Sequence, residues 1–179
     1  MPVILPGARV RLIKEEEGEK YILMVLEETS KAALLDPSQP SKIRWRLPGG
    51  KVEIDIQTGE LKETPFETMN RELLEEKHLR ADADPNYIMY VEYINSDGLE
   101  RAVWVFNATN HKSCTENLNP DHRVLDSGWF LLKNVSGELF SGKYGKTFPV
   151  AKRHISYVHL INKPSKDRPF KKIEIKTPA

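Results

Sequence analysis

The stretch RLPGGKVEIDIQTGELKETPFETMNRELLEEKHL, residues 46–79, carries the clearest structural signals in the chain. Thr64 is a residue type that caps helices, and Pro65 suits the first helical position. Glu67 stands three residues after Thr64, which completes a reciprocal capping box. The sequence therefore predicts a helix that begins directly after Thr64.

The apolar residues of this helix follow a helical repeat. Phe66, Met69 and Leu73 stand at positions i, i+3 and i+7, so they form one stripe along the helix. We expect the stripe to pack on a core while the opposite face of the helix stays accessible.

Three glutamates of the same helix share one patch. Glu72, Glu75 and Glu76 stand at i, i+3 and i+4, and Arg71 precedes Glu75 by four residues, so the two can pair. Carboxylates placed this closely repel one another, and a divalent cation among them would remove the repulsion. Oxygen ligands without His or Cys nearby suit Mg²⁺ or Mn²⁺ rather than zinc, and Mg²⁺ commonly binds substrate phosphates. The patch is a candidate diphosphate site, and a solvated helix face is the alternative interpretation.

The rest of the chain predicts an α/β fold. Apolar or alternating runs indicate strands at residues 8–14, 21–28, 43–50, 87–94, 101–109 and 128–135, and residues 51–63 suggest either a small hairpin or an extended excursion. A second helix is predicted from about Val150 to Asn162, and the polar residues 111–127 are predicted to form a long loop. This order favours a mixed sheet with helices on its faces. We expect one domain over residues 1–162, followed by a basic tail over 163–179.

Composition is that of an ordinary globular protein. Of 179 residues, 39% are hydrophobic and 30% are charged, and the formal net charge of +1 gives no global field to attract nucleic acid or anionic membrane. The single cysteine, Cys114, excludes an internal disulfide and a cysteine metal cage. Neither a signal-peptide pattern nor a run of roughly 20 apolar residues is present. We expect a cytoplasmic protein without a membrane partner.

The glutamate patch also resembles a known motif. The box of the Nudix hydrolase family reads Gly-x5-Glu-x7-Arg-Glu-U-x-Glu-Glu-x-Gly-U, in which U is a bulky aliphatic residue. Here Glu63 is followed after seven residues by RELLEE at 71–76, and Leu79 matches the final position. The preceding LPGGKVE is similar to the family's lead into the box, with Gly50 as the first glycine. We call residues 47–50 the Gly-Gly turn.

Two positions depart from the family pattern. Twelve residues separate Gly50 from Glu63 where the pattern has five, which amounts to a seven-residue insertion before the helix. His78 replaces the closing glycine, whose left-handed conformation histidine adopts at some cost. We expect the helix and its carboxylates to be intact, the pocket mouth to be reshaped and the helix end to be slightly strained.

The resemblance implies a Nudix-type α/β/α sandwich and a pyrophosphohydrolase that depends on Mg²⁺ or Mn²⁺. It implies that the catalytic residues are Arg71 and the three glutamates. It further implies metal coordination by the glutamates, Glu72, Glu75 and Glu76, with Arg71 and Glu63 orienting them through a salt bridge. Gly50 is expected to let the loop backbone approach the helix and the substrate.

A further acid from the loop before Trp129 is expected to act as general base or metal ligand. The candidates are Glu116, Asp121 and Asp126, of which we take Asp121 as the predicted metal ligand. Glu53, close behind the Gly-Gly turn, is one more carboxylate within reach of a metal.

Substrate contacts are predicted from Gly50, Arg46 and Trp45. Arg44 is a second candidate for phosphate, and further candidates to stack on a base are Tyr93, Trp104 and Phe106. For each aromatic residue in a strand, a place in the core is the alternative.

Two functions remain open. The first is hydrolysis of a diphosphate linkage in a nucleoside diphosphate derivative by water attack on phosphorus, with an RNA-cap hydrolase as one variant. The second is a non-catalytic Nudix-like module that binds a nucleotide or an RNA end. The expected partner is a nucleoside diphosphate-linked small molecule, with RNA as a further candidate through the basic tail, and a homodimer would be typical of the family.

Overall fold

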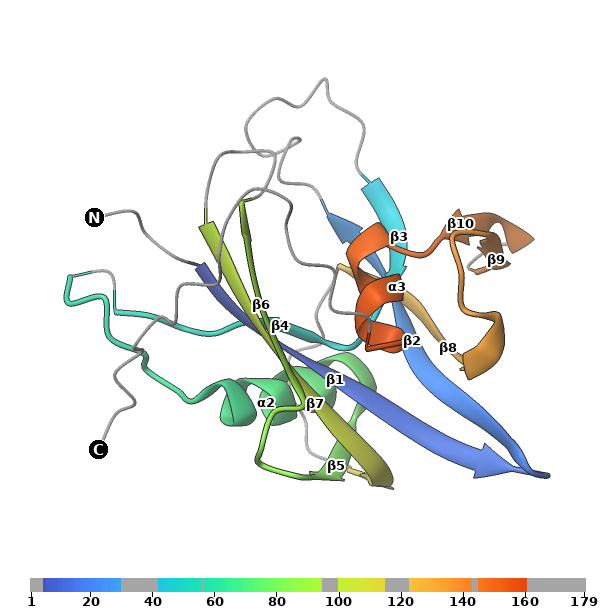
Figure 1. Ribbon diagram of the computed structural model, residues 1–179, viewed down its shortest axis with the longest axis horizontal. Helices are drawn as coiled ribbons and strands as arrows, with labels where there is room; N and C mark the ends of the chain where they lie inside the picture. The colour runs from blue at the N-terminus through green and yellow to red at the C-terminus, as the bar shows by residue number, and fades with distance from the viewer. Residues whose placement is uncertain are drawn as a thin grey trace.

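The computed structural model describes residues 5–29, 42–55, 57–94, 100–114, 123–142 and 145–160 (Figure 1). The elements are, in chain order, β1 (Leu5–Glu16), β2 (Glu19–Thr29), β3 (Lys42–Arg46), β4 (Gly49–Lys51), α2 (Pro65–Lys77), β5 (Leu79–Ala83), β6 (Met89–Ile94), β7 (Glu100–Ser113), β8 (Val124–Leu131), the 3-10 turn η1 (Leu132–Asn134), β9 (Leu139–Ser141), β10 (Thr147–Pro149) and α3 (Lys152–Val158).

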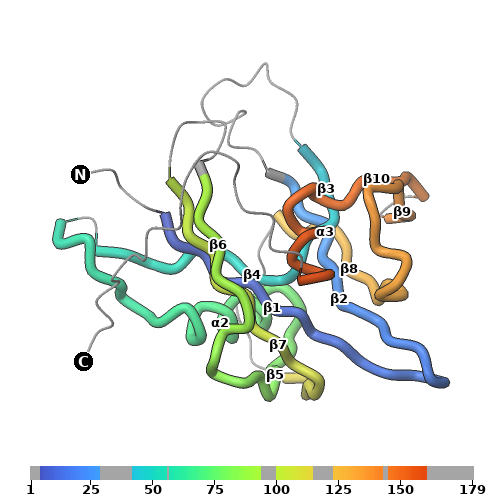
Figure 2. The backbone as a smooth tube through the Cα atoms, in the orientation of Figure 1, coloured from blue at the N-terminus to red at the C-terminus, as the bar shows by residue number. Residues whose placement is uncertain are grey.

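Eight of the described strands form one mixed sheet. Its main path is β3-β2-β1-β7-β5, with β4 paired to β1, β6 to β7 and β8 to β2. The β1–β7 pair is parallel and the other pairs of the sheet are antiparallel. Figure 2 shows β1 and β7 running side by side although they lie far apart in the sequence. β9 and β10 form a separate small hairpin.

The sheet separates two hydrophobic cores. The first core lies under α2, where Met69 and Leu73 are fully buried against β1 and β7. The second core contains Tyr157 and Val158 of α3 together with side chains of β2 and β3. In Figure 1, α2 and α3 accordingly occupy different sides of the molecule. The predicted α/β class, with a mixed sheet between helices, is confirmed.

Two sequence predictions need correction at their boundaries. The predicted loop at 111–127 is shorter, because β7 extends to Ser113 and β8 already begins at Val124. β7 is prolonged by its pairing with β5, where Ser113 faces Leu79. The second helix is also shorter than predicted: it begins at Lys152 and ends at Val158. The predicted tail at 163–179 lies outside the described residues.

Of the two forms predicted for residues 51–63, the structure has the small hairpin. Ile54 bridges Leu61, the amide of Asp55 donates to the carbonyl of Glu60, and Gly59 turns the chain with a φ of 73°. Leu61 is only 5% exposed and belongs to the first core. None of the helices in the described part of the chain has the length and apolar character needed to cross a membrane.

Candidate functional site

Helix α2 begins as the sequence predicts. The hydroxyl of Thr64 accepts a hydrogen bond from the amide of Glu67 at 3.2 Å, and the carboxylate of Glu67 accepts one from the amide of Thr64 at 2.8 Å. The two otherwise unpaired amides at the helix start are thereby satisfied. This cap fixes where the helix begins.

The helix ends in the left-handed conformation that the sequence predicts. His78 has φ 52° and ψ 36°, and its amide donates to the carbonyl of Leu74 at 2.8 Å. The carbonyl of His78 in turn accepts from the amide of Cys114, which ties the helix end to the end of β7. A residue with a Cβ atom adopts this conformation at a cost of about 1–2 kcal/mol.

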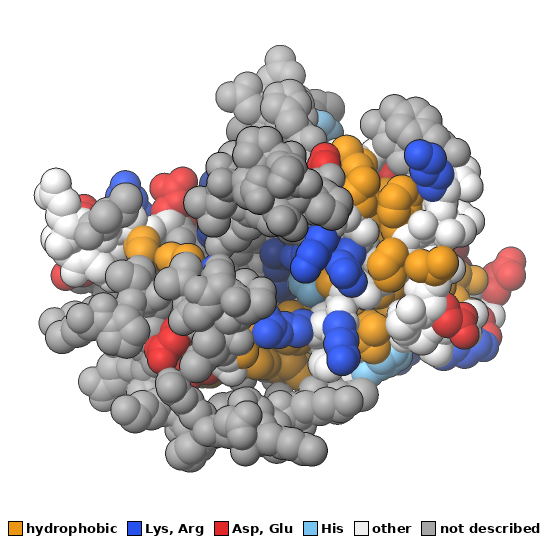
Figure 3. All heavy atoms as spheres, turned by 90° about the horizontal axis from the view of Figure 1, so that it is seen from above, with side chains coloured by type: hydrophobic (Ala, Val, Ile, Leu, Met, Phe, Trp, Pro, Cys, Tyr) orange, Lys and Arg blue, Asp and Glu red, His pale blue; other side chains and the backbone are white. Residues whose placement is uncertain are grey.

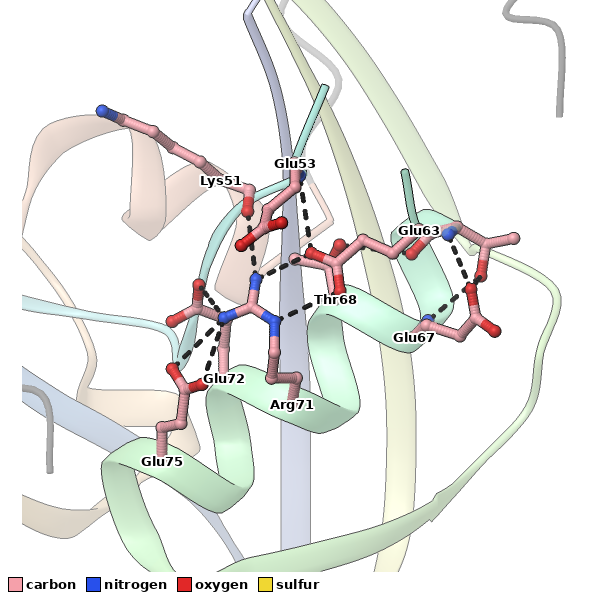
Figure 4. A network of polar contacts seen from close by, with 9 residues as sticks. Lys51, Glu53, Glu63, Glu67, Thr68, Arg71, Glu72 and Glu75 are labelled. Carbon is pink, nitrogen blue, oxygen red and sulfur yellow. Dashed lines mark hydrogen bonds and ion pairs between the residues drawn. The ribbon is translucent and has the colours of Figure 1, made fainter. Parts of the chain in front are cut away.

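Arg71 lies at the centre of a network of carboxylates (Figure 4). Its guanidinium holds Glu63 in a two-point contact, with Nη2 to Oε1 at 2.7 Å and Nε to Oε2 at 3.1 Å. Its Nη1 reaches Glu72 at 3.2 Å and both oxygens of Glu75 at 3.2 and 3.3 Å. Its Nη2 also donates to the carbonyl of Lys51. The expected ion pair between Arg71 and Glu63 is confirmed.

Glu72 packs directly against Gly50 of the Gly-Gly turn. A Cβ atom at Gly50 would stand 2.0 Å from Oε1 of Glu72, far inside any real contact distance. Glu72 is 5% exposed. The absence of a side chain at Gly50 is therefore what allows the turn backbone and this carboxylate to meet.

Glu76 holds the same turn from α2. Its Oε2 accepts a hydrogen bond from the amide of Gly49 at 3.0 Å. Arg9 of β1 donates to the carbonyls of Leu47 and Gly49. The amide of Leu47 donates to Nδ1 of His154 in α3 at 2.9 Å. Side chains from β1, α2 and α3 thus converge on the Gly-Gly turn.

A further carboxylate, Glu27 of β2, is buried near these groups. It lies on the same face of β2 as Leu23, which packs in the core under α2. Glu27 is 6% exposed, and its Oε2 has no hydrogen-bond partner, although it lies 3.8 Å from Nη1 of Arg9 in an ion pair. Its charge helps to raise the pKa of Glu76.

Burial dominates the electrostatics of the glutamates in the site. Burial, and secondarily the neighbouring Glu75, raises the pKa of Glu72 above its usual range even though Arg71 opposes the shift. Burial raises the pKa of Glu76 still further, with Glu72 and Glu27 adding to the effect against Arg9. For Glu63, burial acts to raise the pKa, but the hydrogen bonds of Arg71 and Thr68 outweigh it and lower the pKa. Glu72 and Glu76 therefore remain charged only at a cost that a cation would reduce.

The residues fit a hard divalent cation by the chemistry of their donors. Among the described residues, no three His, Cys, Asp or Glu side chains form a group that could hold a metal ion as they stand. Mg²⁺, however, usually takes one or two protein carboxylates and fills its shell with water and phosphate oxygens. The unpartnered oxygen of Glu27 and the raised pKa values of Glu72 and Glu76 are what such a cation would relieve.

The additional acids expected from the sequence are only partly described. Asp121 and Glu116 lie outside the described residues. Asp126 stands opposite Leu26 in the β2–β8 pair, so it shares the face of the second core and does not join the glutamates of α2. Glu53 is exposed, and its amide donates to Oε1 of Glu63 at 3.4 Å.

Trp45 is a core residue, which corrects its predicted role in stacking on a base. It is 1% exposed, its ring meets Phe130 edge-on at 4.7 Å between centroids, and its Nε1 donates to the carbonyl of Phe140. Trp104 and Phe106 are likewise buried in the first core. Tyr93 lies against the guanidinium of Arg153, which stands 3.4 Å from the ring centroid.

Arg46 and Arg44 lie where they could meet an anion. In the β2–β3 pair, Arg44 stands opposite Glu27 and Arg46 opposite Val25, so both share the face of β2 that carries Glu27. Burial lowers the pKa of Arg46, and the charge of Glu27 counteracts this. Seen from above, lysine and arginine side chains gather in the middle of one face of the molecule, beside hydrophobic side chains (Figure 3).

Sequence reasoning did not identify three residues of the site. Arg9 stands at an alternating position of a strand, Glu27 ends an apolar run, and His154 has no neighbouring histidine at a metal-ligand spacing. His154 is buried, and its bond to Leu47 depends on a tertiary contact between α3 and the turn. Glu27 could have been identified as a site residue because it is a charged residue that continues the apolar run of a predicted strand.

Comparisons with known proteins identify the fold. No family model matches the chain, and no curated protein matches it. Among solved structures, it is similar to a MutT Nudix hydrolase from Burkholderia pseudomallei, with a TM-score of 0.56, 19% identity and coverage of 88% of this chain and 98% of that one. It is also similar to the Escherichia coli ORF135 protein, with a TM-score of 0.55, 18% identity and coverage of 87% of this chain and 88% of that one. A third similar structure is the Nudix domain of Shewanella oneidensis NrtR, solved with ADP ribose, with a TM-score of 0.55, 18% identity and coverage of 89% of this chain and 86% of that one. The chain therefore has the fold of the Nudix hydrolases.

Proposed function

We propose that this chain is a divalent-metal-dependent pyrophosphohydrolase that cleaves the diphosphate linkage of a nucleoside diphosphate derivative. The observation that carries the proposal is the contact between the Gly-Gly turn and α2. The missing side chain of Gly50 makes room for the carboxylate of Glu72, and the amide of Gly49 donates to Glu76. Together with the Nudix-type fold, this arrangement supports a site in which carboxylates, turn backbone and phosphate meet.

The proposed cation site consists of the glutamates of α2, Glu72, Glu75 and Glu76, with Mg²⁺ as the expected ion and Mn²⁺ as a substitute. A cation bound there would neutralise phosphate oxygens and favour attack at phosphorus. Asp121 remains the proposed additional ligand. Arg71 is proposed to orient Glu72 and Glu75, because its guanidinium bridges them.

Hydrolysis adds the oxygen of one water molecule to phosphorus and breaks a bridging P–O bond, whose electron pair stays with the leaving phosphate. The water must therefore give up a proton. Because Glu72 and Glu76 are the proposed ligands of the cation, this proton is proposed to go to the further acid expected from the loop before Trp129, for which Glu116 and Asp121 are the candidates. Arg46 and Arg44 are proposed to contact the phosphates, and Gly50 is proposed to let the backbone of the turn approach the substrate. Trp45 is excluded as a substrate contact because it is buried.

The test is turnover of a panel of nucleoside diphosphate compounds with Mg²⁺ and with Mn²⁺. The panel includes dinucleotide polyphosphates, ADP-ribose, NADH, nucleotide sugars, nucleoside triphosphates and capped RNA. We expect one class to be hydrolysed and Glu76→Gln to be at least ~100-fold slower, which corresponds to about 2.7 kcal/mol of transition-state stabilisation. Glu60→Gln, the same change at an exposed glutamate of the nearby hairpin, serves as the control. Equal rates for wild type and Glu76→Gln would refute the proposal.

Two observations favour the second candidate, a nucleotide-binding module without hydrolysis. Arg71 already places a cation between Glu72 and Glu75, and a structurally similar Nudix domain was solved with ADP ribose. Such a module would bind ADP-ribose equally well with Mg²⁺ and with EDTA and would not turn it over. A titration calorimetry experiment under both conditions separates the two functions.

A further inference from the structure

The Gly-Gly turn is held on both sides by hydrogen bonds, one to a side chain of α3 and one to a side chain of α2. On one side, the amide of Leu47 donates to Nδ1 of His154 at 2.9 Å. On the other side, the amide of Gly49 donates to Oε2 of Glu76 at 3.0 Å. Only Pro48 lies between Leu47 and Gly49. We propose that His154 is a positioning residue that sets the place of the Gly-Gly turn and, through it, the carboxylate of Glu76.

The place of His154 is determined by how α3 docks. Val150 forms a parallel bridge with Trp45, and the amide of Ala151 donates to the carbonyl of Trp45 at 2.9 Å. Tyr157 and Val158 anchor the other end of the helix in the second core. His154 is itself 6% exposed and lies beside Tyr157, with 5.1 Å between ring centroids. Its imidazole therefore has a defined position relative to β3.

The hydrogen bond requires a neutral imidazole with a free lone pair on Nδ1, because Leu47 supplies the proton. Burial, and the nearby charges of Arg9, Arg46 and Arg153, lower the pKa of His154 well below its usual range. The acceptor is thus present at neutral pH. Because Leu47 is fully buried, its amide has no access to water as a substitute partner.

The turn itself is stiff enough to transmit a displacement. The ring of Pro48 fixes its φ angle, and its carbonyl accepts from the amide of Val10 at 3.0 Å. Gly49 has φ 133°, and a Cβ atom there would stand 2.1 Å from the carbonyl oxygen of Ala8, so the turn lies tightly on β1. A shift of the amide of Leu47 therefore moves the amide of Gly49 with it.

The test compares His154→Asn with His154→Leu. Asparagine keeps an acceptor, Oδ1, close to where Nδ1 lies, whereas leucine keeps bulk without an acceptor. His154→Gln is the second variant without a correctly placed acceptor, since its oxygen lies one bond further out, and it replaces leucine if that variant does not fold. The control is His159→Leu, because Nε2 of His159 contacts the carbonyl of Val135 and not the turn.

The first readout is hydrogen exchange of the Gly49 amide by NMR in the metal-free protein. We expect exchange to be at least 10-fold faster in His154→Leu or His154→Gln and to stay within about 3-fold of wild type in His154→Asn and His159→Leu. The second readout is the dissociation constant for Mn²⁺, which we expect to rise about 10-fold in the same two variants only. Unchanged protection of Gly49 in His154→Leu and His154→Gln, or equal loss in His154→Asn, would overturn the proposal.

The Mn²⁺ readout rests on the proposed function, whereas the exchange readout does not. If wild type binds no Mn²⁺, the proposed function fails while the exchange of Gly49 still decides the role of His154. If Mn²⁺ binds equally well in all variants although Gly49 exchange responds as expected, the turn is positioned by His154 but the link to Glu76 as a ligand is refuted.

Discussion

Gly50→Ala isolates the contact between the Gly-Gly turn and α2. The added Cβ would stand 2.0 Å from Oε1 and 2.2 Å from Cδ of Glu72, and real Cβ contacts are not found below 3.0 Å. The carboxylate of Glu72 must therefore move by about 1 Å, because the obstructing atoms lie at the free end of a side chain. Gly50 needs no left-handed backbone, so steric overlap is the only source of cost.

The displacement has a modest effect on stability and a large one on activity. Moving Glu72 weakens its 3.2 Å ion pair with Arg71. Because the side chain of Arg71 is 31% exposed, water screens this pair, and we expect the loss of stability to be about 1–2 kcal/mol rather than that of a fully buried pair. For a chain of this size that lowers the melting temperature by about 2–8 °C. A catalytic group displaced by about 1 Å loses on the order of 100-fold in rate. Most of the molecules thus remain folded while turnover falls.

The assay combines thermal unfolding with kcat/KM on the substrate found in the panel. Gly128→Ala is the matched control, because a Cβ there meets only the side chain of Phe130 at 3.5 Å, an ordinary contact. Gly49→Ala shows the contrasting result: its Cβ would meet backbone at 2.1 Å and its φ is 133°, so it should lose about 3 kcal/mol or more of stability. Wild-type kcat/KM in Gly50→Ala, or a loss explained by the unfolded fraction, would refute the reasoning.

Three further predictions concern α2. The pKa of Glu76 is raised above its unfolded value of 4.5, so the folded state binds this proton more tightly than the unfolded state does. The free energy of unfolding of the metal-free protein should therefore fall as pH rises from about 4.5 through the raised pKa. Urea unfolding at about pH 5 and about pH 8 measures this fall, which should be smaller in Glu76→Gln than in the wild type. His78→Gly should raise the melting temperature by about 2–4 °C, since it relieves about 1 kcal/mol of left-handed strain, and a decrease would contradict that account. Thr64→Ala should cost about 1 kcal/mol by calorimetry, and an unchanged melting temperature would show that the cap contributes nothing.

The features of α2 could be predicted because their causes lie within a few residues. The capping box needs only Thr64 and Glu67, and the left-handed end needs only the position of His78. The ion pair of Arg71 with Glu63 followed from the resemblance and is confirmed by its geometry. Local signals of this kind do not depend on which other strands pair.

The errors arose where strand pairing decides the outcome. The face on which Trp45 lies is set by its register opposite Leu26, and a shift of one residue would have turned its ring to the other side. The polar end of β7 extends because β5 supplies a partner ladder, which outweighs its weak local preference for a strand. The roles of Arg9, Glu27 and His154 likewise depend on tertiary contacts that a single sequence does not reveal.

The parallel ladder between β1 and β7 determines when this chain can fold during synthesis. Leu5 to Leu12 pair with Arg101 to Ala108, so the first strand must wait for its partner until more than half of the chain has left the ribosome. Closing so long a loop makes such pairings slow to form. During that interval the edge of β1 that later pairs with β7 carries unpaired backbone N–H and C=O groups, to which strands of other nascent chains can add. Synthesis at low temperature or with chaperones should therefore increase the soluble yield more than any substitution at the glutamates would.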